Sequence, residues 1–474
     1  MTLGRALTTR DVLRLAWPSA LSYRLNNAYR INDQFWVQGL GADAQAALTS
    51  ALFVSVMNFS LVFLAAGGTL ALVARATGAR DPVTRDRVVA HSIWIGLAVY
   101  ACFAAFGPAL TPHIVELLGL PEGPAAYARD YLTSLYLFSL PLVFAPAIDH
   151  AFIGIGNALV PSLLELGACA FNYLLAPILI YGSHAAERCS HPGAALAASI
   201  ASWFHLEGYG ISGAPVAIAC SRALSVTAGF VGLRVFYGVR WYAHMRFDPK
   251  LLRELLAIGV PVSLSIALYS GVYWALIKFV MVPLGVPVLS ALGLGLSVFE
   301  GVSFPLYLGI GMAGASLVGR SIGARDPEAA WQAVRAARKL ALWVGSTVTV
   351  LFLIVAPIGP RFFSPDPEVV RQTSIYVAVI AFSQLTVAME AANEKILLGA
   401  GYTSRAMWVS MLGNGLRVPL AWYFGVNAGY GALGVWWSLN VTSLLKASLH
   451  FWLVQRGRWL THALARVGAR QPDP

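Results

Sequence analysis

The sequence predicts an all-α integral membrane protein of 12 transmembrane helices, built as two parallel six-helix repeats. Two observations predict this class. The 474-residue chain is 58% hydrophobic and only 12% charged, and its apolar runs repeatedly exceed the roughly 18 residues that cross a bilayer. The segment "LVARATGARDP" (72–82) also recurs as "LVGRSIGARDP" (317–327).

The repeat extends well beyond this motif. Pro18 pairs with Pro261, and "GIGN" from Gly154 pairs with "GAGY" from Gly399 at a nearly constant offset. The number of residues between paired motifs then becomes smaller toward the later "GYG" pair, at 208–210 and 429–431. The first half therefore carries an extra loop, which we place at 183–207 without assigning it a role.

Turn and charge signals between the apolar runs delimit the expected spans. All should be helices, because lipid offers no partner to backbone polar groups and the runs are too long and too evenly apolar for barrel strands. The first half gives spans at 12–38, 45–74, 88–108, 127–153, 160–182 and 211–234, and the second at 254–282, 288–318, 335–358, 372–396, 405–425 and 431–455.

Six spans per half place the start of both halves on the same side of the membrane, so the repeats are related by an axis along the membrane normal. We divide the chain into an N lobe (1–235), a cytoplasmic linker (236–253) and a C lobe with a short basic tail (254–474). The cleft between two such lobes is the expected substrate route.

Basic residues orient the bundle. Most of the 33 Lys and Arg residues fall at the termini and in the even-numbered loops, and four, Arg129, Arg188, Arg361 and Arg371, fall on the other side. We therefore expect a multi-pass protein of the inner (cytoplasmic) membrane with both termini in the cytoplasm. The net charge of +11 then records insertion topology and gives no support to nucleic-acid binding.

The linker carries arginines among aromatic residues. This interleaving is typical of a cytoplasmic interfacial connector, and it also fits lipid headgroup binding. The start of the chain has no cleavable signal pattern, since its polar residues lead directly into a full-length span.

Ionisable residues inside spans are costly and are functional candidates, although internal ion pairing is the plain alternative. Each lobe carries three positive and three negative groups of this kind. They are Arg24, Arg30, Asp33, Asp149, Glu165 and Arg222 in the first half, and Lys278, Glu300, Glu390, Glu394, Arg417 and Lys446 in the second.

On the first span, Asn26, Arg30 and Asp33 follow helical spacing and form one polar stripe that should face the lobe interior. Pro18 lacks an amide proton, so a helix bend is expected near it. Asp33 is then either a static salt bridge with Arg30 or a protonation switch, and the residues alone favour neither.

The bent first span with Asp33 ahead of "GLGADAQAALTSA", together with the doubled "GARDP" elements, resembles the multidrug and toxic compound extrusion (MATE) family over 13–455. The resemblance implies a V-shaped bundle and a secondary antiporter, not an enzyme. Such an antiporter exports organic, often cationic or amphiphilic, compounds in exchange for H⁺ or Na⁺ by rocking of its lobes. It also implies a monomer with no cofactor or metal beyond the coupling ion.

The resemblance assigns ion coupling to Asp33 and to Asn172 on the fifth span. Ala176 stands where the resembled branch often has a second acid, so either Asp33 works alone or Glu165 or Asp149 takes the paired role. The seventh span has no carboxylate. In the second lobe we single out Glu300, Glu390, Glu394 and Arg417.

The expected substrate cavity is lined by Asn26, Arg30, Arg222, Tyr23 and Tyr136. Aromatic rings there would attract planar cations. We expect Arg222 to neutralise Asp33 or Glu165 or to contact an anionic part of the substrate. For Arg417 and Lys446 we expect carboxylate partners such as Glu300 or Glu390.

Two other functions stay open at this stage. A flippase of the same superfamily would move a lipid-linked sugar or another amphiphile, and Arg24, Arg222 and Arg417 suit its cationic cleft. An intramembrane enzyme would need clustered catalytic residues near one membrane face, and no such spacing is present. The substrate and the coupling ion are not determined by the residues.

Overall fold

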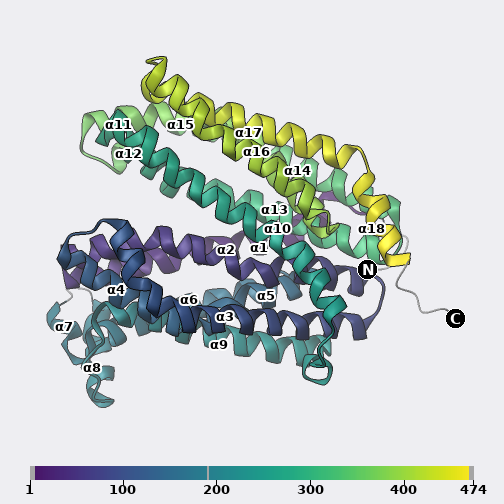
Figure 1. The fold of residues 1–474 in the computed structure, drawn as a ribbon, viewed down its shortest axis with the longest axis horizontal. Coiled ribbons are helices and arrows are strands. Elements are labelled where there is room, and N and C mark those ends of the chain that lie inside the picture. The colour runs from purple at the N-terminus through teal and green to yellow at the C-terminus, as the bar shows by residue number, and fades with distance from the viewer. Residues whose placement is uncertain (1–5, 189–191, 469–474) are drawn as a thin grey trace.

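The computed structural model describes residues 6–188 and 192–468, and these residues form helices joined by short connections, with no strand among them. Figure 1 shows two groups of long helices. The N lobe contains α1 (Thr9–Val37), α2 (Ala42–Gly78), α3 (Pro82–Leu118), α4 (Glu122–Leu137), α5 (Leu140–Ile155), α6 (Leu159–Tyr181), α7 (Ala185–Arg188), α8 (Pro192–Trp203) and α9 (Gly213–Tyr237).

The C lobe repeats the arrangement with α10 (Pro249–Leu276), α11 (Val282–Leu284), α12 (Val286–Leu294), α13 (Glu300–Gly323), α14 (Pro327–Val355), α15 (Pro367–Gly399), α16 (Thr403–Trp422), α17 (Gly431–Gln455) and α18 (Arg458–Gly468). Three π-helical segments continue its spans: Ile277–Met281, Gly295–Phe299 and Tyr423–Asn427. Within the part of the chain that the structure describes, all π-helical turns belong to this lobe.

Eight helices are long and apolar enough to cross a membrane, and the bent pair α4 and α5 makes a ninth. Helices α1, α16 and α17 pack among them and complete the predicted twelve-span bundle. The prediction of one continuous span at 127–153 is wrong in one respect, since α4 and α5 meet at 54°. Pro141 follows the break and disfavours helical geometry in the residue before it.

Most of the extra N-lobe segment at 183–207 is helical rather than a loop. It forms α7 and α8, which lie beyond α6 at the end of the molecule opposite the termini (Figure 1). Backbone hydrogen bonds close the segment at its base, from the Ser183 amide to the Leu206 carbonyl (2.9 Å) and from the Tyr209 amide to the Leu179 carbonyl (2.7 Å). The insertion is thus an ordered extension of the lobe.

The predicted basic tail contains a further helix, α18. Its Trp459 is fully buried, lies 5.5 Å from the ring of Trp331 and donates a hydrogen bond to the Val454 carbonyl (2.8 Å). Apolar residues on one face thus dock the helix against α14 and the end of α17. The other boundary that shifts is the linker, since α9 runs to Tyr237 and α10 begins at Pro249.

The repeated "GARDP" motif ends one helix and starts the next in both lobes. Arg80 and Arg325 adopt positive φ angles (56° and 54°), which stop α2 and α13. The side chains of Asp81 and Asp326 then accept hydrogen bonds from amides in the first turns of α3 and α14. The following prolines occupy the first helical positions, where no amide donor is needed.

Glycines allow α2 and α13 to cross in contact at the end of the molecule that holds both termini (Figure 1). A Cβ on Gly78 would overlap the Arg320 carbonyl, and a Cβ on Gly323 would overlap the Arg75 carbonyl. These two contacts are equivalent under the repeat. The Arg75 guanidinium also donates a hydrogen bond to the Ala400 carbonyl of the C lobe.

The same symmetry governs the neighbouring helix pairs. A Cβ on Gly259 of α10 would overlap the Leu64 carbonyl of α2, and a Cβ on Gly309 of α13 would meet the Ala16 carbonyl of α1. Gly309 begins the segment "GIGMAG" (309–314), and its missing side chain allows this close helix packing. The two lobes therefore join through α1, α2, α10 and α13, and they diverge toward the other end (Figure 1).

We expect Gly78→Ala to destabilise the junction, because its added methyl group cannot fit against the Arg320 backbone. The cost should be about 1–3 kcal/mol, the usual effect of overpacking, and thermal unfolding in detergent would detect it as a lower midpoint. Gly167→Ala is the matched control, since nothing lies within 4 Å of a Cβ there. Equal midpoints for the two variants would contradict the tight junction.

Candidate functional site

Asp33 lies on α1 and is 2% exposed. Its Oδ1 atom is buried and has no hydrogen-bond partner, and no ion pair to Asp33 occurs among the described residues. The static salt bridge with Arg30 is therefore not present. The Arg30 side chain is exposed and interacts electrostatically with Tyr131 of α4, so the predicted polar stripe has a buried Asp33 and an exposed Arg30.

Asn172 on α6 meets the first helix next to Asp33. Its Oδ1 accepts a hydrogen bond from Asn32 Nδ2 (2.7 Å), and both asparagines are buried. Asn32 was not singled out from the sequence, although it is the direct neighbour of Asp33 and a polar residue within an apolar span. Its Oδ1 and the Nδ2 of Asn172 have no partner in the described structure, so unused polar atoms remain beside the carboxylate.

Arg222 on α9 is the centre of a buried network that joins three helices. Its guanidinium pairs with the carboxylate of Glu165 on α6 and donates a hydrogen bond to Asn26 Oδ1 on α1 (2.6 Å). It also lies 4.5 Å from the ring centroid of Tyr29, a residue that the sequence analysis missed. Of the expected partners, Arg222 thus meets Glu165 and not Asp33.

This pairing leaves the N-lobe interior with an excess of carboxylates. Asp149 on α5 is half-buried, interacts electrostatically with Glu165 and Arg222, and makes no ion pair within the residues described. The Arg222 guanidinium therefore forms an ion pair with Glu165, while Asp33 and Asp149 form no ion pair among the described residues. Such an interior is electrostatically suited to a cation.

Two other predicted cavity residues occupy different surroundings. Tyr23 on α1 interacts electrostatically with Asp149 of the N lobe and Glu394 of the C lobe, which places it between the lobes. Tyr136 is instead buried within the N lobe. It lies 5.7 Å from the ring of Phe103, and its hydroxyl bonds Asn58 (3.1 Å), so it is a packing residue in this conformation.

In the C lobe the carboxylates expected beside Arg417 interact with other residues. Glu390 pairs with Lys446 (2.9 Å), and Glu300 accepts a hydrogen bond from the Tyr376 hydroxyl. Glu394 pairs with its neighbour Lys395 (3.0 Å) at the lobe junction. The expected carboxylate partner is therefore confirmed for Lys446, whereas Arg417 forms no ion pair among the described residues.

Buried Arg417 instead has hydroxyl partners. It donates hydrogen bonds to Thr442 (3.2 Å), Tyr273 (3.2 Å) and Ser443 (3.3 Å). Tyr273 packs against Tyr269, with ring centroids 4.7 Å apart. The two lobes thus differ in their unpaired cations: the N-lobe guanidinium of Arg222 is ion-paired, whereas the C-lobe guanidinium of Arg417 forms no ion pair among the described residues.

Pro18 lies within α1, which continues as a helix on both sides of it. The helix bend near Pro18 stays a prediction. No group of three or more metal-ligating side chains is found among the described residues.

We expect Arg222→Ala to cost about 3–5 kcal/mol, because it leaves the Glu165 carboxylate buried and unpaired. The double variant Arg222→Ala/Glu165→Gln should recover part of this loss, since the isolated charge is gone. A double-mutant cycle on thermal or denaturant unfolding measures the difference. Additive effects of the two substitutions would show that the pair contributes no coupling.

Comparison with known proteins gives one family model, described as MatE, which matches residues 18–178 and 261–423. The two matched regions begin at Pro18 and Pro261, the residues that pair in the internal repeat. Together they cover more than half of the chain.

Similar sequences extend over nearly the whole chain. A probable multidrug resistance protein NorM of Bradyrhizobium diazoefficiens is 28% identical over 460 residues, covering 96% of this chain and 94% of the relative. A protein of the same description from Burkholderia pseudomallei is 29% identical over 465 residues, covering 94% and 92%.

Solved structures share the fold. A structure described as the outward-facing conformation of a multidrug resistance MATE family transporter of the MOP superfamily aligns with a TM-score of 0.80 at 21% identity, covering 96% of this chain and 97% of that one. A MATE crystal structure in the straight conformation aligns with a TM-score of 0.82 at 20% identity and the same coverage. At these identities the likeness establishes the architecture.

Proposed function

The chain belongs to the MatE family, and from this premise we propose that it is a secondary antiporter for organic, cationic or amphiphilic compounds. It would export them across the cytoplasmic membrane in exchange for H⁺ or Na⁺. The multidrug resistance descriptions of relatives that align over more than 90% of the chain support the substrate class. The chain would act as a transporter and not as an enzyme.

The observation that carries this proposal is the buried Asp33 carboxylate, which has no cationic partner among the described residues. An isolated charge in an apolar interior is unfavourable, so a carboxylate placed there gains from binding a proton or a cation. If the coupling ion and a cationic substrate both neutralise Asp33, binding of one disfavours the other. Competition at one carboxylate is sufficient to exchange them.

The neighbouring groups leave polar atoms available at the level of Asp33 on the helix. Asn32 precedes Asp33 on α1, and its Oδ1 and the Nδ2 of its partner Asn172 have no hydrogen-bond partner in the described structure. Glu165 is already held by Arg222 and does not compete for the ion. We therefore assign coupling to Asp33, with Asn32 and Asn172 as positioning residues and Glu165 as a structural partner of Arg222.

Movement of the lobes would expose the site alternately to the two sides. The helices α1 and α2 of one lobe and α10 and α13 of the other form the junction at one end, and the lobes diverge at the other (Figure 1). We assign a rocking motion about this junction, with Tyr23 at the point where the two lobes meet. A monomer contains the whole site.

We expect Asp33→Asn to abolish gradient-coupled export. Everted vesicles that carry a proton gradient should show collapse of the gradient by an organic cation or by sodium through the wild type only, because the amide cannot bind a proton or balance a cation. Asp43→Asn, at an exposed position near the start of α2, is the matched control and should keep the response. Wild-type silence over the whole panel of compounds would contradict antiport and favour the flippase alternative.

The flippase alternative has one observation in its favour. Arg417 is buried, and its hydrogen bonds go to hydroxyl groups, so it could accept an anionic headgroup without first breaking an ion pair. The MatE match and the carboxylate-rich N lobe favour the antiporter.

We expect the C-terminus to lie in the cytoplasm, because most basic residues fall at the termini and on the loops of the same side. A green fluorescent protein fused after residue 474 should therefore fluoresce in cells, since it does not mature after export in unfolded form. A dark fusion at normal expression, with activity of a periplasmic reporter at the same position, would reverse the orientation.

A further inference from the structure

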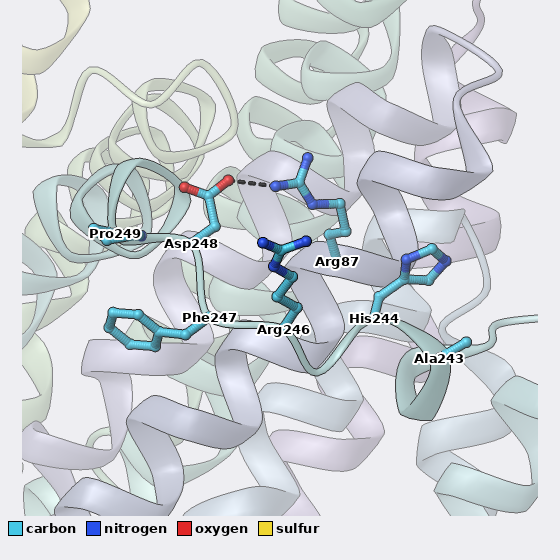
Figure 2. A pocket seen from close by; sticks show the side chains of 7 residues that line it. All are labelled: Arg87, Ala243, His244, Arg246, Phe247, Asp248 and Pro249. Atoms are coloured by element: carbon cyan, nitrogen blue, oxygen red, sulfur yellow. Dashed lines mark hydrogen bonds and ion pairs between the residues drawn. The ribbon is translucent and has the colours of Figure 1, made fainter.

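The linker between the lobes lines an open pocket of about 460 Å³, which lies at the same end of the molecule as the termini. Figure 2 shows its lining. Arg87 comes from α3 of the N lobe, and Asp248 and Pro249 begin α10 of the C lobe. The remaining lining residues are Ala243, His244, Arg246 and Phe247 of the linker itself.

The linker is fixed firmly to the N lobe, so the pocket is a built feature. Asp86 accepts a hydrogen bond from the Arg240 amide (2.8 Å), and His91 Nε2 accepts one from the Asp248 amide (2.9 Å). Trp94 donates to the Met245 carbonyl (3.0 Å). Each contact joins α3 to the linker at a different residue.

The pocket has an excess of positive charge. Asp248 is its one carboxylate, and it is occupied by the Arg87 guanidinium and by the amides of Lys250 (2.9 Å) and Leu251 (3.3 Å). Slight burial raises the pKa of Asp248, but these hydrogen bonds and the Arg87 charge together hold the net pKa below its usual range. Arg87 and Asp248 therefore balance each other at neutral pH.

Arg246 is left without a counter-charge. It is exposed, makes no ion pair in the described part of the chain, and points its guanidinium toward the Arg87 side of the pocket in Figure 2. His244 lies farther to the right in Figure 2, beyond Arg87. A planar guanidinium with free donors is well matched to a phosphate group, which can accept two parallel hydrogen bonds.

Exposed aromatic rings lie in the pocket and in the adjoining residues of the chain. Phe236, Tyr242 and Phe247 are all more than half exposed, and Phe247 points away from Arg246 in Figure 2. Large exposed rings next to basic residues at the end of membrane spans are typical of the bilayer interface, where the rings meet acyl chains and the cations meet headgroups. A soluble phosphate would satisfy Arg246 and leave the rings in water.

We propose that this pocket binds the phosphate group of an anionic membrane lipid, with Arg246 as its principal ligand and the aromatic residues against the lipid chains. The proposal rests on the orientation given under Proposed function, which places the linker at the cytoplasmic leaflet. Because the pocket wall includes residues of both lobes, a bound lipid bridges the hinge between them.

The test uses the purified full-length protein in mixed micelles and native mass spectrometry of the retained lipid. Phosphatidylglycerol should be retained in preference to phosphatidylcholine. Arg246→Gln should reduce this preference about fivefold, the effect of one basic residue at an anionic surface. Arg246→Lys keeps the charge but not the planar donors, so it should retain more of the preference than Arg246→Gln and shows that the loss does not come from unfolding.

The matched control is Arg405→Gln, another exposed arginine at the start of a helix (α16) and outside the pocket. An equal loss in this variant would overturn the site in favour of general surface charge. Displacement of phosphatidylglycerol by inorganic phosphate alone would overturn the lipid assignment and make the pocket a soluble phosphate site. Lipid retention is measured without transport, so failure of the antiport assay leaves this result independent.

Discussion

The close crossing of α2 and α13 is the constraint on which the rest of the structure depends. Two glycines, Gly78 and Gly323, bring the backbone of each helix against the other, with no room for a side chain at either position. The arginine one turn before each glycine contributes the opposing carbonyl, so the contact is made twice by the same sequence element. A tight, symmetric junction joins the lobes at one end, and the lobes diverge at the other (Figure 1).

The symmetric framework carries an asymmetric set of charges. Asp33 in the first repeat corresponds to the fully buried Leu276 in the second, by the offset between Pro18 and Pro261. The N lobe therefore holds a carboxylate without a cation, while the C lobe holds Arg417 among hydroxyl groups. Packing needs both repeats to have the same shape, but it does not need the same buried charges in both.

The linker is anchored to both lobes. It is anchored to α3 through backbone and side-chain hydrogen bonds, and Asp248 caps α10 at the first turn of the second lobe. Any ligand held beside Arg246 therefore touches the segment that connects the two lobes. The basic linker residues that satisfy the positive-inside rule are therefore also positioned to contact lipid headgroups.

The sequence by itself determined the fold class, the repeat and most of the span limits, because bilayer thickness and helical geometry act on the chain locally. It also determined Asp33 as the leading candidate, since an acid in an apolar span is conspicuous without any structure. Only the tertiary structure decided the partners. Arg222 forms an ion pair with Glu165, Asn172 accepts a hydrogen bond from Asn32, and the Arg30 side chain is exposed. Pairing depends on how α1, α6 and α9 are rotated and spaced against one another. Residue spacing within one helix does not contain that information.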